Sequence, residues 1–173
     1  DALDVAILAV ASASGGQRMA RFPFTEDRKR ETAILQLTPG RLGAFVKGAP
    51  ETVLGMTPLC SAERSQWAAR IDTYATTGHK VIACASLTFD EAAWRGDEPD
   101  HDYAFAGVLA FEDPVRDGVI DAIATCRRGD IRVIMVTGDH PLTAAAIGRE
   151  IGLADGAPVV VEADTIETTL RNN

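Results

Sequence analysis

Hydrophobic positions in the first part of the chain follow two different spacings. Three short apolar runs have the composition of strands, at residues 31–37, 41–48 and 80–87. The first two flank a Thr-Pro-Gly turn, which predicts a β-hairpin. Helical spacing is found in residues 3–13 and in the series Trp67, Ile71 and Tyr74. This pattern predicts an α+β domain with antiparallel strand pairs, and residues 91–102 read as an acidic surface loop.

From Tyr103 onward, strands and helices alternate. The predicted order is strand, helix, strand, helix, strand, over residues 103–111, 117–128, 131–138, 141–152 and 157–163. Continuous apolar strands separated by helices are typical of a parallel sheet that is covered on both faces. We therefore place a domain boundary near Gly107, which divides the chain into residues 1–107 and 108–173.

Composition narrows the classes of partner. The chain of 173 residues has a net charge of −8, so we expect no nucleic-acid partner. Its cysteines are odd in number and its histidines are scattered, so we expect no metal site. No apolar run approaches the roughly 20 residues that span a bilayer, so we expect no direct membrane contact. Because the chain lacks an initial methionine and stops in a polar stretch, we interpret it as part of a longer protein.

The stretch from Val136 to Pro141 carries the first candidate chemistry. A Thr-Gly-Asp turn follows a predicted strand, and Pro141 suits the first turn of a helix. Backbone N–H groups and the Thr137 hydroxyl there can hold an oxyanion at the carboxyl edge of a parallel sheet. An ordinary strand-to-helix turn with Asp139 as the helix cap fits the same residues, and the residues alone leave both interpretations open.

Four motifs give the chain a strong family resemblance. Residues 137–147 resemble the T-G-D-x-x-x-T-A-x-A-I-A signature of P-type cation-transporting ATPases. FVKGAPE at 45–51 resembles the family's K-G-A-P-E motif, FTEDRKR at 24–30 its F-S-x-D-R-K segment, and residues 110–116 its D-P-P-R hinge. The motifs follow in the family's order and cover nearly the whole chain. The resemblance implies an α+β nucleotide-binding domain, an antiparallel sheet flanked by helices, followed by a partial α/β haloacid-dehalogenase-like (Rossmann-type) segment of the phosphorylation domain.

The resemblance also implies contacts for ATP. Phe24 would stack on the adenine ring, which needs only an exposed aromatic face. Lys47 would meet the nucleotide beside Gly48, whose missing side chain permits close approach of a ligand. Lys29 would lie near the phosphates. The competing interpretations are a core phenylalanine beside Phe22 and two solvated lysines.

The resemblance implies two further ATP contacts, at positions where the residue type differs from the one usual in the family. Asp4 corresponds to an acidic residue near the adenine amino group but is one methylene shorter, and it also suits the first turn of a helix. Lys80 stands where arginine is usual, so it would contact phosphate without a bidentate grip. Glu26 occupies a position where many relatives carry arginine, and a carboxylate cannot take that role.

The resemblance assigns Thr137, Gly138 and Asp139 to the wall of a phosphorylation site, and Asp113, Pro114 and Arg116 to a hinge. The family's phosphorylated aspartate lies in D-K-T-G-T and its magnesium site in G-D-G-x-N-D, and neither occurs in this chain. We therefore expect no catalytic residue and no metal ligand in the chain, and no ATP hydrolysis by the chain alone.

For the intact protein the resemblance implies an enzyme that couples ATP hydrolysis, through an aspartyl phosphate, to cation transport. ATP would be its cofactor, with Mg²⁺ in the intact pump. Its partners would be the pump's remaining phosphorylation, actuator and transmembrane domains, and the chain would be a cytoplasmic part of an integral membrane protein. The alternatives are a freestanding haloacid-dehalogenase-like phosphatase, which would need an early D-x-D-x-T motif that is absent, and a catalytically silent nucleotide-sensing module.

Overall fold

The computed structural model describes residues 2–10, 16–112, 114–154, 156, 158–161 and 165. The chain divides into two compact units, Asp1–Ala68 with Val81–Phe111, and Ala69–Lys80 with Glu112–Asn173. The helices and strands, in order, are α1 (Ala2–Val10), β1 (Gln17–Phe22), β2 (Arg30–Thr38), β3 (Arg41–Gly48), α2 (Pro50–Gly55), α3 (Ser61–Thr76), β4 (Lys80–Asp90), the 3-10 helix η1 (Glu91–Ala93), β5 (Ala104–Phe111), α4 (Val119–Arg128) and α5 (Pro141–Glu150). None of the helices in the described part of the chain is long and apolar enough to cross a membrane.

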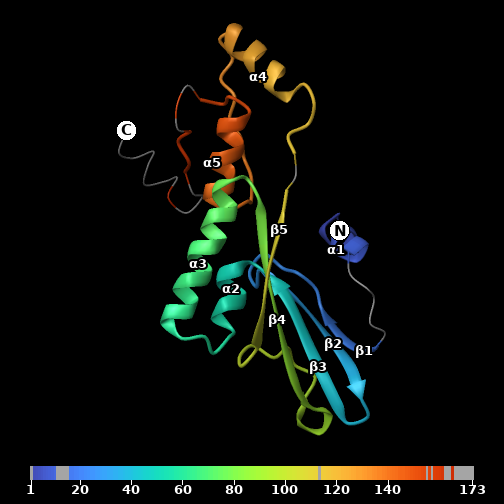
Figure 1. The fold of residues 1–173 in the computed structure, drawn as a ribbon. Coiled ribbons are helices and arrows are strands. Elements are labelled where there is room, and N and C mark those ends of the chain that lie inside the picture. Colours follow the sequence, from blue (N-terminus) through green and yellow to red (C-terminus); the bar gives the residue numbers. More distant parts are fainter. Residues whose placement is uncertain are drawn as a thin grey trace. The chain divides into compact units, whose positions relative to one another are not determined.

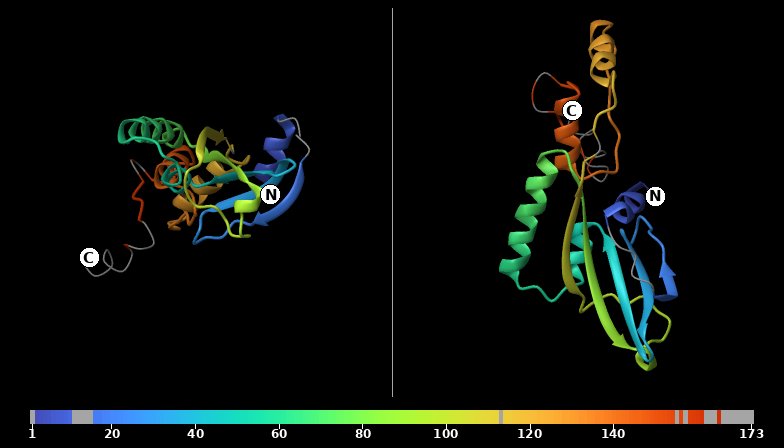
Figure 2. Two further views of the ribbon diagram at one scale, coloured as in Figure 1. Left: turned by 90° about the horizontal axis from the view of Figure 1, so that it is seen from below. Right: turned by 45° about the vertical axis from the view of Figure 1, so that its right-hand side comes forward.

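The first unit is built on a five-stranded sheet with the strand order β1-β2-β3-β4-β5 (Figure 1). The pairs β1–β2, β2–β3 and β3–β4 are antiparallel, and the strands twist together as usual for such a sheet (Figure 2). The predicted hairpin is confirmed, because β2 and β3 pair up to Thr38 and Arg41. Gly40 takes a left-handed φ of 79° in the turn between them, a conformation that glycine adopts at little cost.

One face of this sheet carries the core. Thr32 and Ile34 on β2 are fully buried and pair with Val46 and Ala44 on β3. The cluster also contains Leu42, Ala83 and Ala85 from the sheet, Val53 and Met56 from α2 and the residue that follows it, and Tyr103. Since side chains alternate across a strand, the intervening residues of β2 and β3 lie on the opposite face. That second face holds the charged pair Glu31 and Lys47, which are opposite each other in register.

The strand predicted at 103–111 was expected to begin the parallel sheet, and this expectation is wrong. Strand β5 lies beside β4 in the antiparallel sheet and runs through Gly107 to Phe111. The reason is its anchoring in the first unit. The Tyr103 side chain is fully buried, the Tyr103 amide donates to the Met56 carbonyl at 3.1 Å, and Phe105 packs edge-on against Trp67 at 4.8 Å between ring centroids.

The described residues of the second unit form the two predicted helices α4 and α5, but none of the predicted parallel strands. Residues 131–137 and 158–161 form no strand, and residues 157, 162 and 163 lie outside the described residues. The Ile134 and Val136 side chains are 76% and 93% exposed. A parallel strand of this apolar kind needs hydrogen-bonded neighbours and cover on both faces, and the described residues provide neither. The haloacid-dehalogenase-like arrangement of this segment therefore stays a proposal.

Candidate functional site

Residues 23–28, here called the Phe24 loop, make up most of the connection between β1 and β2 and present an aromatic ring to solvent. The Phe24 side chain is 57% exposed, whereas the neighbouring Phe22 packs against the core. The Arg28 guanidinium folds back over the loop, donating to the Pro23 carbonyl and, at 3.2 Å, to the Thr25 hydroxyl. Phe24 is thus no core residue, and its ring is available for stacking.

The segments that carry Lys29 and Lys47 are joined through their backbones. Lys29 adopts a left-handed φ of 50°, and its carbonyl accepts a hydrogen bond from the Ala49 amide at 2.9 Å. A Cβ on Gly48 would lie 2.8 Å from the Arg30 Cα and nearer still to the Lys29 carbonyl oxygen. Gly48 therefore lets two segments of the chain approach each other. The sequence suggested only that Gly48 permits close approach of a ligand.

The basic groups of this site are partly neutralised by nearby carboxylates. The Lys47 ammonium contacts the Asp4 carboxylate of α1 and lies 3.7 Å from the Glu31 carboxylate. Lys29 is more exposed and lies 3.9 Å from the Glu51 carboxylate. The hydrogen bond from Lys47 holds the pKa of Asp4 below its usual value, so the carboxylate is charged at neutral pH. Asp4 and Lys47, both predicted as nucleotide contacts, are therefore brought together.

The predicted phosphate residues of the second unit also form a group. The Lys80 ammonium lies 3.5 Å from one carboxylate oxygen of Asp139, and the Thr137 hydroxyl donates to the other at 2.9 Å. The Asp139 amide donates in turn to the Thr137 hydroxyl at 3.1 Å. Asp139 is not the cap of α5, because His140 holds that position and its Nδ1 accepts from the Leu142 amide. Gly138 lies exposed between Thr137 and Asp139.

Sequence reasoning missed Glu98, which it placed in an acidic surface loop. The Glu98 side chain is only 10% exposed. Its carboxylate accepts hydrogen bonds from Arg28 at 2.7 Å, from Arg30 at 3.1 and 3.2 Å, and from the buried Thr32 hydroxyl at 2.6 Å. Burial raises the pKa of Glu98, but the hydrogen bonds from Arg30, Thr32 and Arg28 outweigh burial and hold the pKa below its usual value. The only available signal was the Arg28-Lys29-Arg30 cluster, whose two arginines require a partner.

This pKa shift predicts a pH dependence of stability. The folded Glu98 binds a proton less readily than the unfolded one, so its stabilisation is present above the ordinary pKa of 4.5 and is lost as pH falls through the lower folded value. We expect the free energy of unfolding to drop more in wild type than in Glu98→Gln between about pH 7 and about pH 3.5, as measured by urea unfolding. Glu51→Gln, which changes an exposed side chain, is the control. Equal losses in wild type and Glu98→Gln would contradict the assignment.

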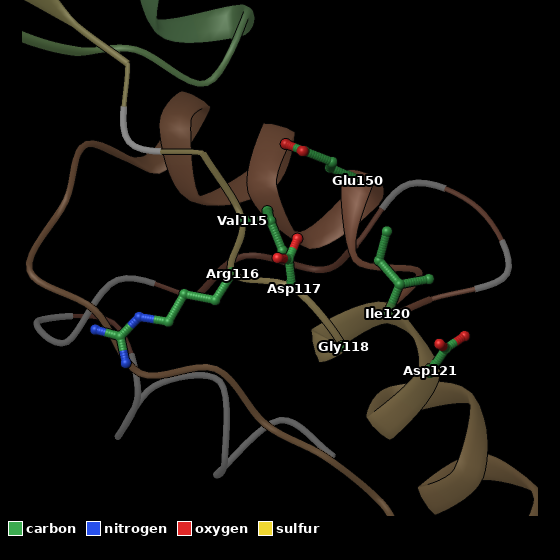
Figure 3. A pocket seen from close by; sticks show the side chains of 7 residues that line it. All are labelled: Val115, Arg116, Asp117, Gly118, Ile120, Asp121 and Glu150. Carbon is green, nitrogen blue, oxygen red and sulfur yellow. The ribbon is translucent and has the colours of Figure 1, made fainter.

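The predicted hinge borders a hollow in the second unit. Asp113 lies outside the described residues, and Pro114 and Arg116 are exposed. A hollow of about 350 Å³ is lined by Val115, Arg116, Asp117, Gly118, Ile120, Asp121 and Glu150 (Figure 3). In Figure 3 the Arg116 guanidinium lies apart from the carboxylates. Among the residues that the structure describes, no three acidic, histidine or cysteine side chains are grouped to hold a metal ion.

The five-stranded sheet flanked by helices, with residues 24–30 and 45–51 joined at the ends of β2 and β3, is an α+β domain. Residues 2–118 match the family model described as P-type ATPase, cytoplasmic domain N. The chain belongs to the P-type cation-transporting ATPases.

Three relatives illustrate the range of this family. The chain is 33% identical over 151 residues to "Calcium-transporting ATPase 4, plasma membrane-type" of Arabidopsis thaliana, covering 81% of this chain and 15% of the relative. It is 32% identical over 184 aligned positions to "Probable cation-transporting ATPase I" of Mycobacterium tuberculosis, covering 94% and 11%. It is 34% identical over 143 residues to "Sodium/potassium exporting P-type ATPase cta3" of Schizosaccharomyces pombe, covering 76% and 14%. The chain thus spans only a small part of each relative.

Proposed function

We propose that the first unit binds ATP for a pump that couples ATP hydrolysis to cation transport. The observation that carries this proposal is the meeting of two motifs through the backbone. The Lys29 amide donates to the Thr25 carbonyl at 2.8 Å, and the Lys29 carbonyl accepts from Ala49, two residues after Lys47. An exposed ring and two lysines therefore belong to one continuous piece of structure, which suits a ligand with a flat base and an anionic tail.

Each residue has a role in this proposal. Phe24 stacks on the adenine ring, Asp4 accepts a hydrogen bond from its exocyclic amine, and Lys47 and Lys29 contact the nucleotide as point charges. Because Glu26 adds negative charge where an arginine would help, the phosphates are held loosely. The described residues offer no group of ligands for Mg²⁺, so the metal would be held by the rest of the intact pump.

The second unit would supply part of a phosphorylation site in a haloacid-dehalogenase-like domain that begins after β5, a few residues later than the boundary predicted near Gly107. In this proposal Thr137, Gly138 and Asp139 line the site, and Pro114 and Arg116, with Asp113, form the hinge. Lys80 reaches the phosphates after leaving Asp139. The phosphorylated aspartate of D-K-T-G-T is not in this chain, so the chain alone forms no phosphoprotein. Its partners are the remaining phosphorylation, actuator and transmembrane domains, on the cytoplasmic side of a membrane.

Titration with ATP tests the binding proposal. We expect weak binding, with a dissociation constant in the high-micromolar to millimolar range (roughly 4–6 kcal/mol). The described residues offer no group of ligands for Mg²⁺, and nearby carboxylates already neutralise part of the charge of Lys29 and Lys47. Amide NMR shifts should change first at Phe24, Lys29 and Lys47. Inorganic tripolyphosphate is the control, and it should move the lysine segments without moving the Phe24 loop. No shift near Phe24 or Lys47 at about 10 mM ATP would refute the proposal.

A further inference from the structure

The Phe24 loop is tied to a distant part of the chain through one arginine. Arg28 donates to the Pro23 carbonyl and to the Thr25 hydroxyl, which lie on either side of Phe24. Its remaining guanidinium nitrogen donates to Glu98 at 2.7 Å. The shape of the loop around the ring therefore depends on the orientation of Arg28, and Glu98 is the side chain that orients it.

Glu98 itself is rigidly placed. It belongs to residues 94–103, here called the strap, which connect η1 to β5. Within the strap, the Trp94 indole donates to the Asp97 carbonyl at 2.8 Å, and the Tyr103 hydroxyl donates to the Pro99 carbonyl at 3.1 Å. Tyr103 is fully buried in the core. The carboxylate of Glu98 is thus fixed relative to the sheet, and it transmits that fixed position to Arg28.

The Glu98 side chain is nine-tenths buried, so its carboxylate needs hydrogen-bond donors, and two donors from the sheet already serve it. Arg30 and Thr32 both donate to Glu98 and belong to β2. Arg28 lies outside the strand and is not required to close the core. Its pairing with Glu98 connects the loop that carries the exposed Phe24 to the strap. Ordering a loop before a ligand arrives lowers the entropic cost of binding.

We propose that Glu98, acting through Arg28, is a positioning residue for the nucleotide base: it holds the Phe24 loop in the conformation that presents the ring for stacking. This inference rests on the proposed function, since it assigns to Glu98 the preorganisation of that same site. It concerns the base and not the phosphates, because the Lys47 segment has its own contacts with Asp4 and Glu31.

The test compares base-dependent with base-independent binding. Glu98→Gln keeps the shape of the side chain and removes its charge. Arg28→Lys keeps the charge but removes the guanidinium group that donates to Pro23, Thr25 and Glu98. We expect each variant to weaken AMP and ATP by the same factor, about tenfold, and to leave the shifts caused by inorganic tripolyphosphate unchanged. Backbone ¹⁵N relaxation should show residues 23–28 becoming more mobile. Thr57→Val, which removes a buried hydrogen bond to the Leu54 carbonyl of α2, is the matched control for general destabilisation.

The outcomes separate the two proposals. If wild type binds AMP with shifts at Phe24 but Glu98→Gln and Arg28→Lys bind it equally well, the positioning role is wrong and the proposed function stands. The positioning role is also wrong if Thr57→Val weakens AMP as much as they do. If wild type shows no shift at Phe24 with either nucleotide, the proposed function itself fails. Should Glu98→Gln not fold, Arg28→Lys decides the question alone, because it leaves Arg30 and Thr32 to satisfy the carboxylate.

Discussion

Gly48→Ala is expected to destabilise the first unit by about 1–3 kcal/mol and to weaken nucleotide binding. The added methyl group would lie 2.8 Å from the Arg30 Cα and closer to the Lys29 carbonyl, and real Cβ atoms do not approach backbone so closely. Neither atom can yield cheaply, because the Lys29 carbonyl is hydrogen-bonded to the Ala49 amide and Arg30 is paired in β2. Separating the two segments would separate Lys29 from Lys47.

Urea unfolding and an ATP titration on the same samples measure both effects. Gly55→Ala is the matched control, because its Cβ would meet nothing within 4 Å and it ends helix α2. That substitution should be neutral or slightly stabilising, since alanine reduces the freedom of the unfolded chain. If Gly48→Ala unfolded at the same urea concentration as Gly55→Ala, the close backbone approach would not be required.

Phe24→Ala is expected to have the largest effect on affinity without an effect on stability. Stacking of a base on an aromatic ring contributes about 1–3 kcal/mol, and Phe24 has no place in the core cluster. Lys29→Ala should cost less than about 1 kcal/mol, because its ammonium is exposed and already near Glu51. Base contacts would then dominate, so AMP, ADP and ATP should bind wild type within about tenfold of one another.

Calorimetry with the three nucleotides on wild type and both variants decides the order of these effects. Tyr74→Ala removes another exposed aromatic side chain, on α3, and serves as the control that should leave binding unchanged. A Lys29→Ala variant that lost more AMP affinity than Phe24→Ala would overturn the assignment of the ring as the main contact.

The β2–β3 hairpin and helices α3, α4 and α5 were predictable from the sequence because their signals are local. A Thr-Pro-Gly turn and the spacing of Trp67, Ile71 and Tyr74 act over a few residues. The buried position of Glu98 was not predictable, since it depends on pairing with arginines 68 and 70 residues away, in a loop whose composition suggests solvent. Composition describes a segment on average and does not identify the carboxylate in it that the fold pairs with two arginines.

Two strand predictions differ from the structure for another reason. An apolar run shows that a segment favours strand geometry, but not which sheet it joins, so residues 103–111 were predicted as a strand and assigned to the wrong sheet. Residues 131–137 have the same apolar character and no neighbour among the described residues with which to pair. For the candidate site, the motifs named Lys47 and Asp139, while their pairing with Asp4 and Lys80 required the folded structure.

The contact between Lys47 and Asp4 joins the first helix of the chain to the proposed nucleotide site. In that proposal both members of the pair contact the nucleotide, so binding would exchange their contact with each other for contacts with the ligand. Because linkage is reciprocal, a change in the attachment of α1 to β3 would change the affinity of the site, and occupancy of the site would change that attachment. Occupancy of the proposed site would then be coupled to the position of the first helix.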